Sequence, residues 1–190
     1  MSHTAHDLQL DRRDTALVVI DIQERLFAAM DPAVQESVVQ KTRILIEGAR
    51  QVGVSILATE QYPKGLGPTV TPIREALGGD VEMLEKIEFN CGAADGFLGK
   101  LRERGIQKVV LCGMEAHICV LQTAAGLMRE GFGVWVAEDA ICSRFKANWK
   151  AGRRLAAEAG AVVAPVEAVL FMLLGKAGTP EFKAISKLVR

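Results

Sequence analysis

The sequence lacks an excess of charge of either sign. Its 190 residues include 23 Lys and Arg residues and 23 Asp and Glu residues, which gives a formal net charge of zero. Such a chain has no overall field that would attract nucleic acid or an anionic membrane surface. We therefore expect neither as a partner, and a small molecule or another protein fits the composition better.

Long apolar runs are also missing. No segment approaches the roughly 18 consecutive apolar residues that a membrane-spanning helix needs. Residues 1–14 are polar and charged, without the apolar stretch of a secretory signal peptide. We expect a cytoplasmic, unanchored protein with a disordered segment at residues 1–14 and a single domain at residues 15–190, since this length suits one core.

Histidine and cysteine are scarce. The histidines are His3, His6 and His117, and the cysteines are Cys91, Cys112, Cys119 and Cys142. Their wide, irregular spacing, with no CxxC pair, argues against a structural zinc site and against a disulfide framework. The loop KGLGPT also lacks the GxxxxGK[ST] and GxGxxG spacings of phosphate-binding loops, which argues against a nucleotide cofactor.

What the sequence does contain is an alternation of short apolar runs and helical patterns. The runs have the length and β-branched content of buried strands, and they lie at residues 16–22, 54–60, 109–114, 133–138 and 161–164. Helical patterns lie at residues 32–52, 96–105, 116–131, 146–160, 165–175 and 180–190. This order predicts βαβ units and an α/β fold of three layers, αβα and Rossmann-like, with a mostly parallel sheet covered by helices on both faces.

Reactive side chains follow the expected strands. Asp21 ends the first apolar run, Lys86 lies in VEMLEK, and Cys119 follows VVLCGM. Because ligands bind beyond the carboxyl ends of an open parallel sheet, these three side chains should meet in one crevice. A thiol needs activation at neutral pH, and the N-terminus of a helix beginning near Ala116, the cation of Lys86 and the carboxylate of Asp21 could each supply it.

Each of these residues also has an ordinary structural explanation. A single Cys in an apolar helix usually packs in the core, an Asp at a strand end is often a loop cap, and Lys86 could be a solvated surface lysine. His117 lies two residues before Cys119, and helical residues i and i+2 face different directions. We therefore interpret His117 as a structural or pocket-lining residue. Glu60, Gln61 and Tyr62 open a Gly- and Pro-rich loop and lie either on the surface or at a pocket.

Taken together, these segments resemble the isochorismatase-like cysteine hydrolases. VVIDIQ is similar to the motif that carries the catalytic aspartate of that family, EKIEFN to the segment with its lysine, and LCGMEAHICVLQTA to its nucleophile motif. The resemblance implies a catalytic triad of Asp21, Lys86 and Cys119. It runs from Leu17 to about Val189 and is strongest toward the isochorismatase domain-containing proteins.

The resemblance also implies finer features of the site. It places a cis peptide bond between Met114 and Glu115 and an oxyanion hole at the backbone N–H groups of Glu115 and Cys119. A homo-oligomer is expected on the same grounds. The residues expected to contact the substrate are Gln23, Glu60, Gln61, Tyr62, Phe89 and His117.

One departure from the resembled family concerns metals. Nicotinamidases of this superfamily hold a divalent metal through an Asp and several His residues after the second strand, whereas this chain reads ATEQYPKGLG there. We expect no catalytic metal and no cofactor. Three functions stay open: hydrolysis of a small amide-type (C–N acyl) substrate through a thioester, vinyl-ether hydrolysis that uses Asp21 without the thiol, and non-catalytic binding on the same fold.

Overall fold

The fold is built on one six-stranded sheet, in the order β3-β2-β1-β4-β5-β6. The computed structural model describes residues 8–190. The strands are β1 (Thr15–Ile20), β2 (Ser55–Gln61), β3 (Met83–Lys86), β4 (Lys108–Met114), β5 (Gly133–Cys142) and β6 (Val162–Ala164). Every pairing between neighbouring strands is parallel. β1 and β4 lie at the centre, where the order of the strands reverses.

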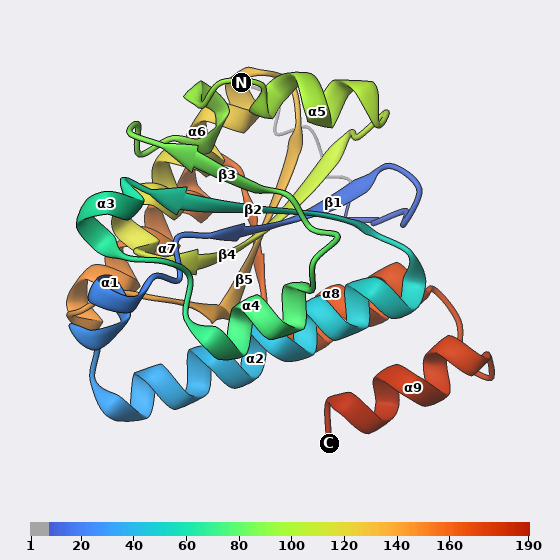
Figure 1. The fold of residues 1–190 in the computed structure, drawn as a ribbon. Helices are drawn as coiled ribbons and strands as arrows, with labels where there is room; N and C mark the ends of the chain where they lie inside the picture. Colours follow the sequence, from blue (N-terminus) through green and yellow to red (C-terminus); the bar gives the residue numbers. More distant parts are fainter. Residues whose placement is uncertain (1–7) are drawn as a thin grey trace.

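Helices cover both faces of this sheet (Figure 1). They are α1 (Glu24–Ala28), α2 (Pro32–Val52), α3 (Pro63–Leu66), α4 (Thr71–Leu77), α5 (Phe97–Glu103), α6 (Leu121–Arg129), α7 (Lys146–Ala159), α8 (Val166–Leu174) and α9 (Pro180–Leu188). A 3₁₀ turn at Cys91–Ala93 and a π-helical turn at Ala116–Val120 complete the list. The predicted three-layer α/β fold is confirmed.

Two apolar layers separate the helices from the sheet. Successive residues of a strand point to opposite faces, so Leu17 and Val19 of β1 pack with α2, α4, α8 and α9. Val18 and Ile20 pack on the other face with α5, α6 and α7. All of β1 is buried, which explains why its sequence is continuously apolar and shows no alternation.

Helix α2 begins and ends as its sequence predicts. The Asp31 side chain accepts a hydrogen bond from the Ala33 N–H (2.9 Å), and Pro32 is the first helical residue. At the other end Gly53 adopts a left-handed conformation with φ of 75°. These are the capping features that the Asp-Pro and Gly positions favour.

Several elements differ from the expected boundaries. The ambiguous segment at residues 81–89 forms the short strand β3, and β5 continues four residues beyond Glu138. β2 includes Glu60, as the strand expected at residues 54–60 does, and continues one residue further, to Gln61. The short helices α1, α3 and α4 were not expected, because segments of four to seven residues carry too little helical periodicity to detect.

The N-terminal segment that was expected to be disordered spans residues 1–14, of which residues 1–7 lie outside the described part. The remainder contacts the domain. Leu10 is 6% exposed and packs in the core, and the Asp14 carbonyl accepts a hydrogen bond from the Gln107 N–H at 2.7 Å. Among residues 8–190, no helix has both the length and the apolar character needed to cross a membrane.

Candidate active site

The three side chains of the expected triad lie at the carboxyl edge of the sheet. Asp21 directly follows β1, Lys86 is the last residue of β3, and Cys119 lies in the π-helical turn after β4. All three are buried, with exposed fractions of 0%, 3% and 5%. Since β1 pairs with both β2 and β4, the topology brings the ends of these strands to one place.

Asp21 is held through both carboxylate oxygens. Lys86 Nζ lies 2.6 Å from Oδ2, and the Thr59 hydroxyl donates to Oδ1 at 2.7 Å. Lys86 also donates to Gln61 Oε1 at 2.7 Å. A buried ion pair is stable only with such additional hydrogen bonds, because both charges have lost their hydration.

The charges of this cluster affect its titration. Burial opposes the charge on Lys86, but Asp21, Cys91 and Cys119 outweigh it, so the pKa of Lys86 is raised and the ammonium stays charged. Burial raises the pKa of the Cys119 thiol to about 12, assisted by the charge of Asp21 and by a hydrogen bond to it, and Lys86 offsets only part of this. We had expected the helix N-terminus and Lys86 to favour a thiolate. The pKa is instead raised, because burial and the charge of Asp21 outweigh the attraction of Lys86.

The backbone around the triad adopts uncommon conformations. Asp21 has φ of 51°, in the left-handed region that Asp tolerates better than most residues. Gly113, the next-to-last residue of β4, has φ of 115°. A Cβ atom at Gly113 would lie 2.0 Å from the Ile20 carbonyl oxygen, so only glycine lets β4 approach β1 here.

The turn after β4 contains the cis peptide bond between Met114 and Glu115 that the resemblance implies. The buried Glu115 carboxylate accepts hydrogen bonds from the Arg144 backbone N–H (2.8 Å) and from Arg144 Nε (3.2 Å). The Glu115 carbonyl accepts from the Ile118 and Val120 N–H groups. Hydrogen bonds to the side chain and to the backbone carbonyl of Glu115 therefore both hold the turn in place. It begins with π-helical and not α-helical geometry, which the sequence did not indicate.

Two glutamines expected to contact substrate have protein partners instead. Gln23 Oε1 accepts from the Gln61 N–H (2.7 Å), and its Nε2 donates to the carbonyls of Gln61 (3.0 Å) and Gly67 (2.7 Å). The Gln61 side chain joins Lys86 to the Ile87 carbonyl. Both amide groups thus hold the strand end and the following loop around Lys86.

Glu60 also has a structural environment. Its carboxylate accepts hydrogen bonds from the N–H (2.6 Å) and hydroxyl (2.7 Å) of Thr69 and forms an ion pair with Arg74 at 3.3 Å. These contacts anchor the loop between β2 and α4. All of them are made by Oε1, and they satisfy that oxygen of the buried carboxylate without a ligand.

Aromatic side chains lie exposed next to Lys86. The Tyr62 N–H donates to the Lys86 carbonyl at 2.8 Å, and the Tyr62 side chain is 53% exposed. Phe89, at 51% exposure, belongs to the short segment between Lys86 and Cys91. Both residues are therefore exposed close to Lys86, Tyr62 through this backbone hydrogen bond and Phe89 through its place in the chain.

His117 is joined to the segment after β5. Asn148 Nδ2 contacts its Nε2 at 3.2 Å, and Ser143 Oγ contacts its Nδ1 at 3.0 Å. An amide nitrogen can only donate, so Nε2 accepts and Nδ1 carries the proton. Both ring nitrogens are thus engaged by the protein, and a structural or pocket-lining role for His117 stays a prediction.

Sequence reasoning missed the polar layer beneath the triad. The Thr59 hydroxyl bonds to Asp21 and also lies 3.7 Å from Cys91 Sγ, while the Cys91 N–H donates to Thr123 Oγ1 at 3.0 Å. The available signal was a threonine inside the apolar run of β2, two residues before its end. Burial raises the pKa of this second thiol, Cys91, to about 11.

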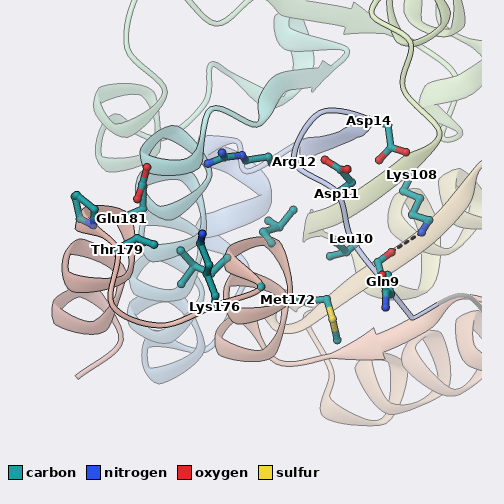
Figure 2. Close-up of a pocket in the computed structure, with 14 residues that line it drawn as sticks. Gln9, Leu10, Asp11, Arg12, Asp14, Lys108, Met172, Lys176, Thr179 and Glu181 are labelled. Carbon is teal, nitrogen blue, oxygen red and sulfur yellow. Dashed lines mark hydrogen bonds between the residues drawn. The ribbon is translucent and has the colours of Figure 1, made fainter.

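The triad does not line either of two large cavities in the described part of the chain. One, of about 820 Å³, lies at the amino ends of β1 and β4 (Figure 2). The other, of about 650 Å³, lies beside the end of β5. Within residues 8–190, no group of three or more His, Cys, Asp or Glu side chains is placed to hold a metal ion.

A parallel three-layer α/β fold with a buried Asp–Lys pair beside a thiol is an arrangement suited to an enzyme of the hydrolase class. The isochorismatase domain matches residues 15–168, and the chain therefore belongs to the isochorismatase family of hydrolases.

Relatives match along most of this chain. The secreted isochorismatase effector Isc1 of Phytophthora sojae is 33% identical over 181 residues, covering 93% of this chain and 84% of that protein. Isochorismatase domain-containing protein 2A of Mus musculus is 32% identical, covering 92% of this chain and 82% of the relative. A solved Caenorhabditis elegans structure described as MAR1 ribonuclease has a TM-score of 0.89 at 32% identity, covering 95% of this chain and 92% of that one.

Proposed function

We propose that this chain hydrolyses a small amide-type (C–N acyl) substrate, with Cys119 as the nucleophile and a thioester as the intermediate. The observation that carries the proposal is the buried Cys119 thiol in the same cluster as the Asp21 carboxylate, which Lys86 and Thr59 hold in place. A thiol beside a carboxylate that can accept its proton is the starting state for coupled deprotonation and attack.

Acylation would begin when Cys119 Sγ attacks the substrate carbonyl carbon while Asp21 takes the thiol proton. The resulting oxyanion would accept hydrogen bonds from the backbone N–H groups of Glu115 and Cys119. As the C–N bond breaks, Asp21 returns the proton to the leaving nitrogen. The released amine and the thioester on Cys119 then account for all atoms and charges.

Deacylation would repeat the same proton transfers with water. Asp21 removes a proton from water, whose oxygen attacks the thioester carbonyl carbon, and the C–S bond breaks. The proton passes from Asp21 to Cys119 Sγ, and the acid leaves. Lys86 keeps its charge throughout, because its raised pKa opposes loss of its proton.

The substrate would enter past Tyr62 and Phe89, whose exposed rings flank Lys86. These rings offer apolar contact to the part of the substrate that does not react. Gln23 and Gln61 would act indirectly, by positioning the loop and Lys86, since their amide groups are engaged by the protein.

The two remaining functions make different demands on the site. A vinyl-ether hydrolase would need Asp21 as an acid but not the thiol, whereas a binding protein would need neither. The structure offers no observation that favours either of them over amide hydrolysis.

Comparison of Cys119→Ala with Asp21→Asn separates these functions. The screen would use small amides, carbamoyl compounds, isochorismate and, because the C. elegans relative is described as a ribonuclease, RNA. For an amide substrate we expect both variants to lose at least about a thousandfold in kcat. Cys112→Ala is the control, since Cys112 is buried inside β4 and bonded to the Val18 carbonyl.

Other outcomes would refute this mechanism or support one of the other two functions. Full amide turnover by Cys119→Ala would refute the thioester mechanism. Isochorismate turnover that survives in Cys119→Ala and fails in Asp21→Asn would identify the vinyl-ether reaction. Turnover of no compound, together with a Cys119 that does not react with iodoacetamide, would indicate a binding protein.

Assembly into a homo-oligomer and a cytoplasmic location are also proposals. Core burial accounts for Val169 and Leu170 in the apolar helix α8, whereas Phe171 and Met172 remain 39% and 37% exposed. These two side chains are the part of α8 that an oligomer would cover. We expect light scattering after gel filtration to give a mass of at least two chains, and Phe171→Lys to lower it. A single-chain mass at micromolar concentration would contradict the proposal.

A further inference from the structure

A second concave site lies beside the carboxyl end of β5. It is the cavity of about 650 Å³ between the first turns of α2 and the segment that joins β5 to α7. Its apolar walls are Val34, Val38, Ile141, Phe145 and Trp149. A volume of this size with mostly apolar walls and a few polar groups is typical of small-molecule sites.

The acidic side chains that line this cavity are already engaged by protein groups. They are Asp31 with the Ala33 N–H (2.9 Å), Glu138 with Arg153, and Asp139 with Lys41 (3.4 Å) and the Val166 N–H (2.7 Å). Arg153 and Lys41 compensate the charges of Glu138 and Asp139, and the Asp31 carboxylate caps the N-terminus of α2. They therefore leave little demand for a cationic ligand.

Of the two basic side chains that line the cavity, one is paired within the described part of the chain and the other is not. Arg144 is paired with Glu115, but Lys146 forms no ion pair or hydrogen bond through its side chain within residues 8–190. Lys146 is the first residue of α7, whose N-cap residue, Phe145, makes no capping hydrogen bond through its side chain. The first-turn N–H groups of α7 and the Lys146 ammonium together leave uncompensated positive potential at the rim.

Phe145 gives the rim an apolar surface beside this charge. Its ring is 64% exposed although it lines the cavity, and it precedes Lys146 directly. A ligand with a flat apolar body would cover this ring and contact Trp149, while its charged group would reach Lys146. The size of the cavity, its apolar walls and its unpaired positive charge thus suit ligands of one chemical class.

We propose that this cavity is a second ligand site, separate from the Cys119 site, for a small organic anion with an aromatic or other apolar body. Carboxylates and sulfonates of this type supply both the negative charge and the apolar body. Asp21, Lys86 and Cys119 do not line the cavity, so its ligand does not occupy the proposed catalytic centre. The inference does not depend on the reaction that Cys119 performs.

Two fluorescent probes of similar shape and different charge test this proposal. 8-Anilinonaphthalene-1-sulfonate is anionic, and N-phenyl-1-naphthylamine is its uncharged counterpart. We expect the folded protein to bind the anionic probe more tightly, with quenching of Trp149 fluorescence. Lys146→Glu should weaken binding of the anion about three- to fivefold and leave the neutral probe unchanged. Phe145→Ala should weaken both probes by roughly tenfold.

Matched variants separate this cavity from other apolar surfaces. Lys150→Glu changes the same charge one turn later on α7, outside the cavity lining, and should leave both affinities unchanged. Phe89→Ala removes another exposed aromatic ring (51%, against 64% for Phe145), outside the cavity lining, and should have no effect either. Circular dichroism confirms that each variant is folded, because partly folded states also bind the anionic probe.

Three results would overturn the proposal. The first is absence of binding to the folded wild-type protein. The second is an equal response to Lys146→Glu and Lys150→Glu. The third is protection of Cys119 from iodoacetamide by more than about tenfold at saturating probe, which would make the cavity part of the catalytic site.

Discussion

At the amino edge of the sheet lies the larger cavity, whereas the residues of the candidate active site lie at the carboxyl edge. The larger cavity, about 820 Å³, lies at the amino edge, where Figure 2 shows Lys176 and Glu181 on one side and Asp14 and Lys108 on the other. The carboxyl edge holds the buried Asp21–Lys86 pair beside Cys119. Desolvated, hydrogen-bonded charge locates the candidate active site better than cavity size does.

The ion pairs at the two edges have different energetic consequences. At the amino edge, Arg13 and Asp11 are 2.5 Å apart with side chains that are 85% and 42% exposed, so water screens the pair. The Lys86–Asp21 pair has no exposed side-chain surface. Removal of one partner there would leave a charge without hydration, and this is the basis of the first experiment.

Lys86→Met should have the largest effect on stability. It leaves the Asp21 carboxylate buried without its cation, and breaking such a pair costs about 3–5 kcal/mol. Urea denaturation measures the free energy of unfolding. Lys176→Met makes the same change at the amino-edge cavity and should cost less than about 0.5 kcal/mol. Equal effects of the two substitutions would remove the distinction between the edges.

The state of the resting thiol gives the second test. Because burial and Asp21 raise the pKa of Cys119 to about 12, its thiolate fraction should grow about tenfold per pH unit, with no plateau up to about pH 10. The rate of alkylation by iodoacetamide reports this fraction. An exposed thiol made by Lys176→Cys in a Cys119→Ala background should level off near pH 9. A plateau for Cys119 near neutral pH would instead indicate a preformed thiolate–Lys86 pair.

The smallest expected difference concerns two threonines. Thr59→Val removes the donor to Asp21 Oδ1, and Thr179→Val removes the cap that accepts from the Phe182 N–H at the start of α9. Each should cost about 1 kcal/mol of stability. Only Thr59→Val should also lower kcat, by roughly tenfold with little change in KM, because Asp21 loses its orientation.

Thr59→Ser restores the hydroxyl and should recover most of the lost activity. A drop in kcat for Thr179→Val of the same size would show that general destabilisation, and not the orientation of Asp21, explains the result.

The sequence indicated where the main residues of the site lie in the fold, but not the hydrogen bonds that hold them. The apolar runs of β1 and β4 and the Asp-Pro start of α2 are local signals, and they place Asp21 and Cys119 at strand ends. The partners of those residues are set by long-range packing. Nothing near Thr59 in the sequence indicates that its hydroxyl meets a carboxylate 38 residues away.

Errors in the predicted boundaries have physical causes too. The sequence predicts a strand at residues 133–138, which ends before the charged residue Asp139. In the fold, Asp139 accepts a hydrogen bond from the Val166 N–H at the start of α8, which lets the strand continue. Gln61 was assigned to a loop, whereas its amide is bonded to Lys86.

The π-helical turn at Ala116–Val120 makes the spacing of this segment as important as its composition. Each residue advances an α-helix by about 100°, and the turn sets the phase between Cys119 and the buried face of α6. Deletion of one residue here would restore ordinary α-helical phase and rotate the thiol away from Asp21, although Asp21, Lys86 and Cys119 would all still be present. Insertions and deletions in this segment should therefore be tolerated less well than most substitutions.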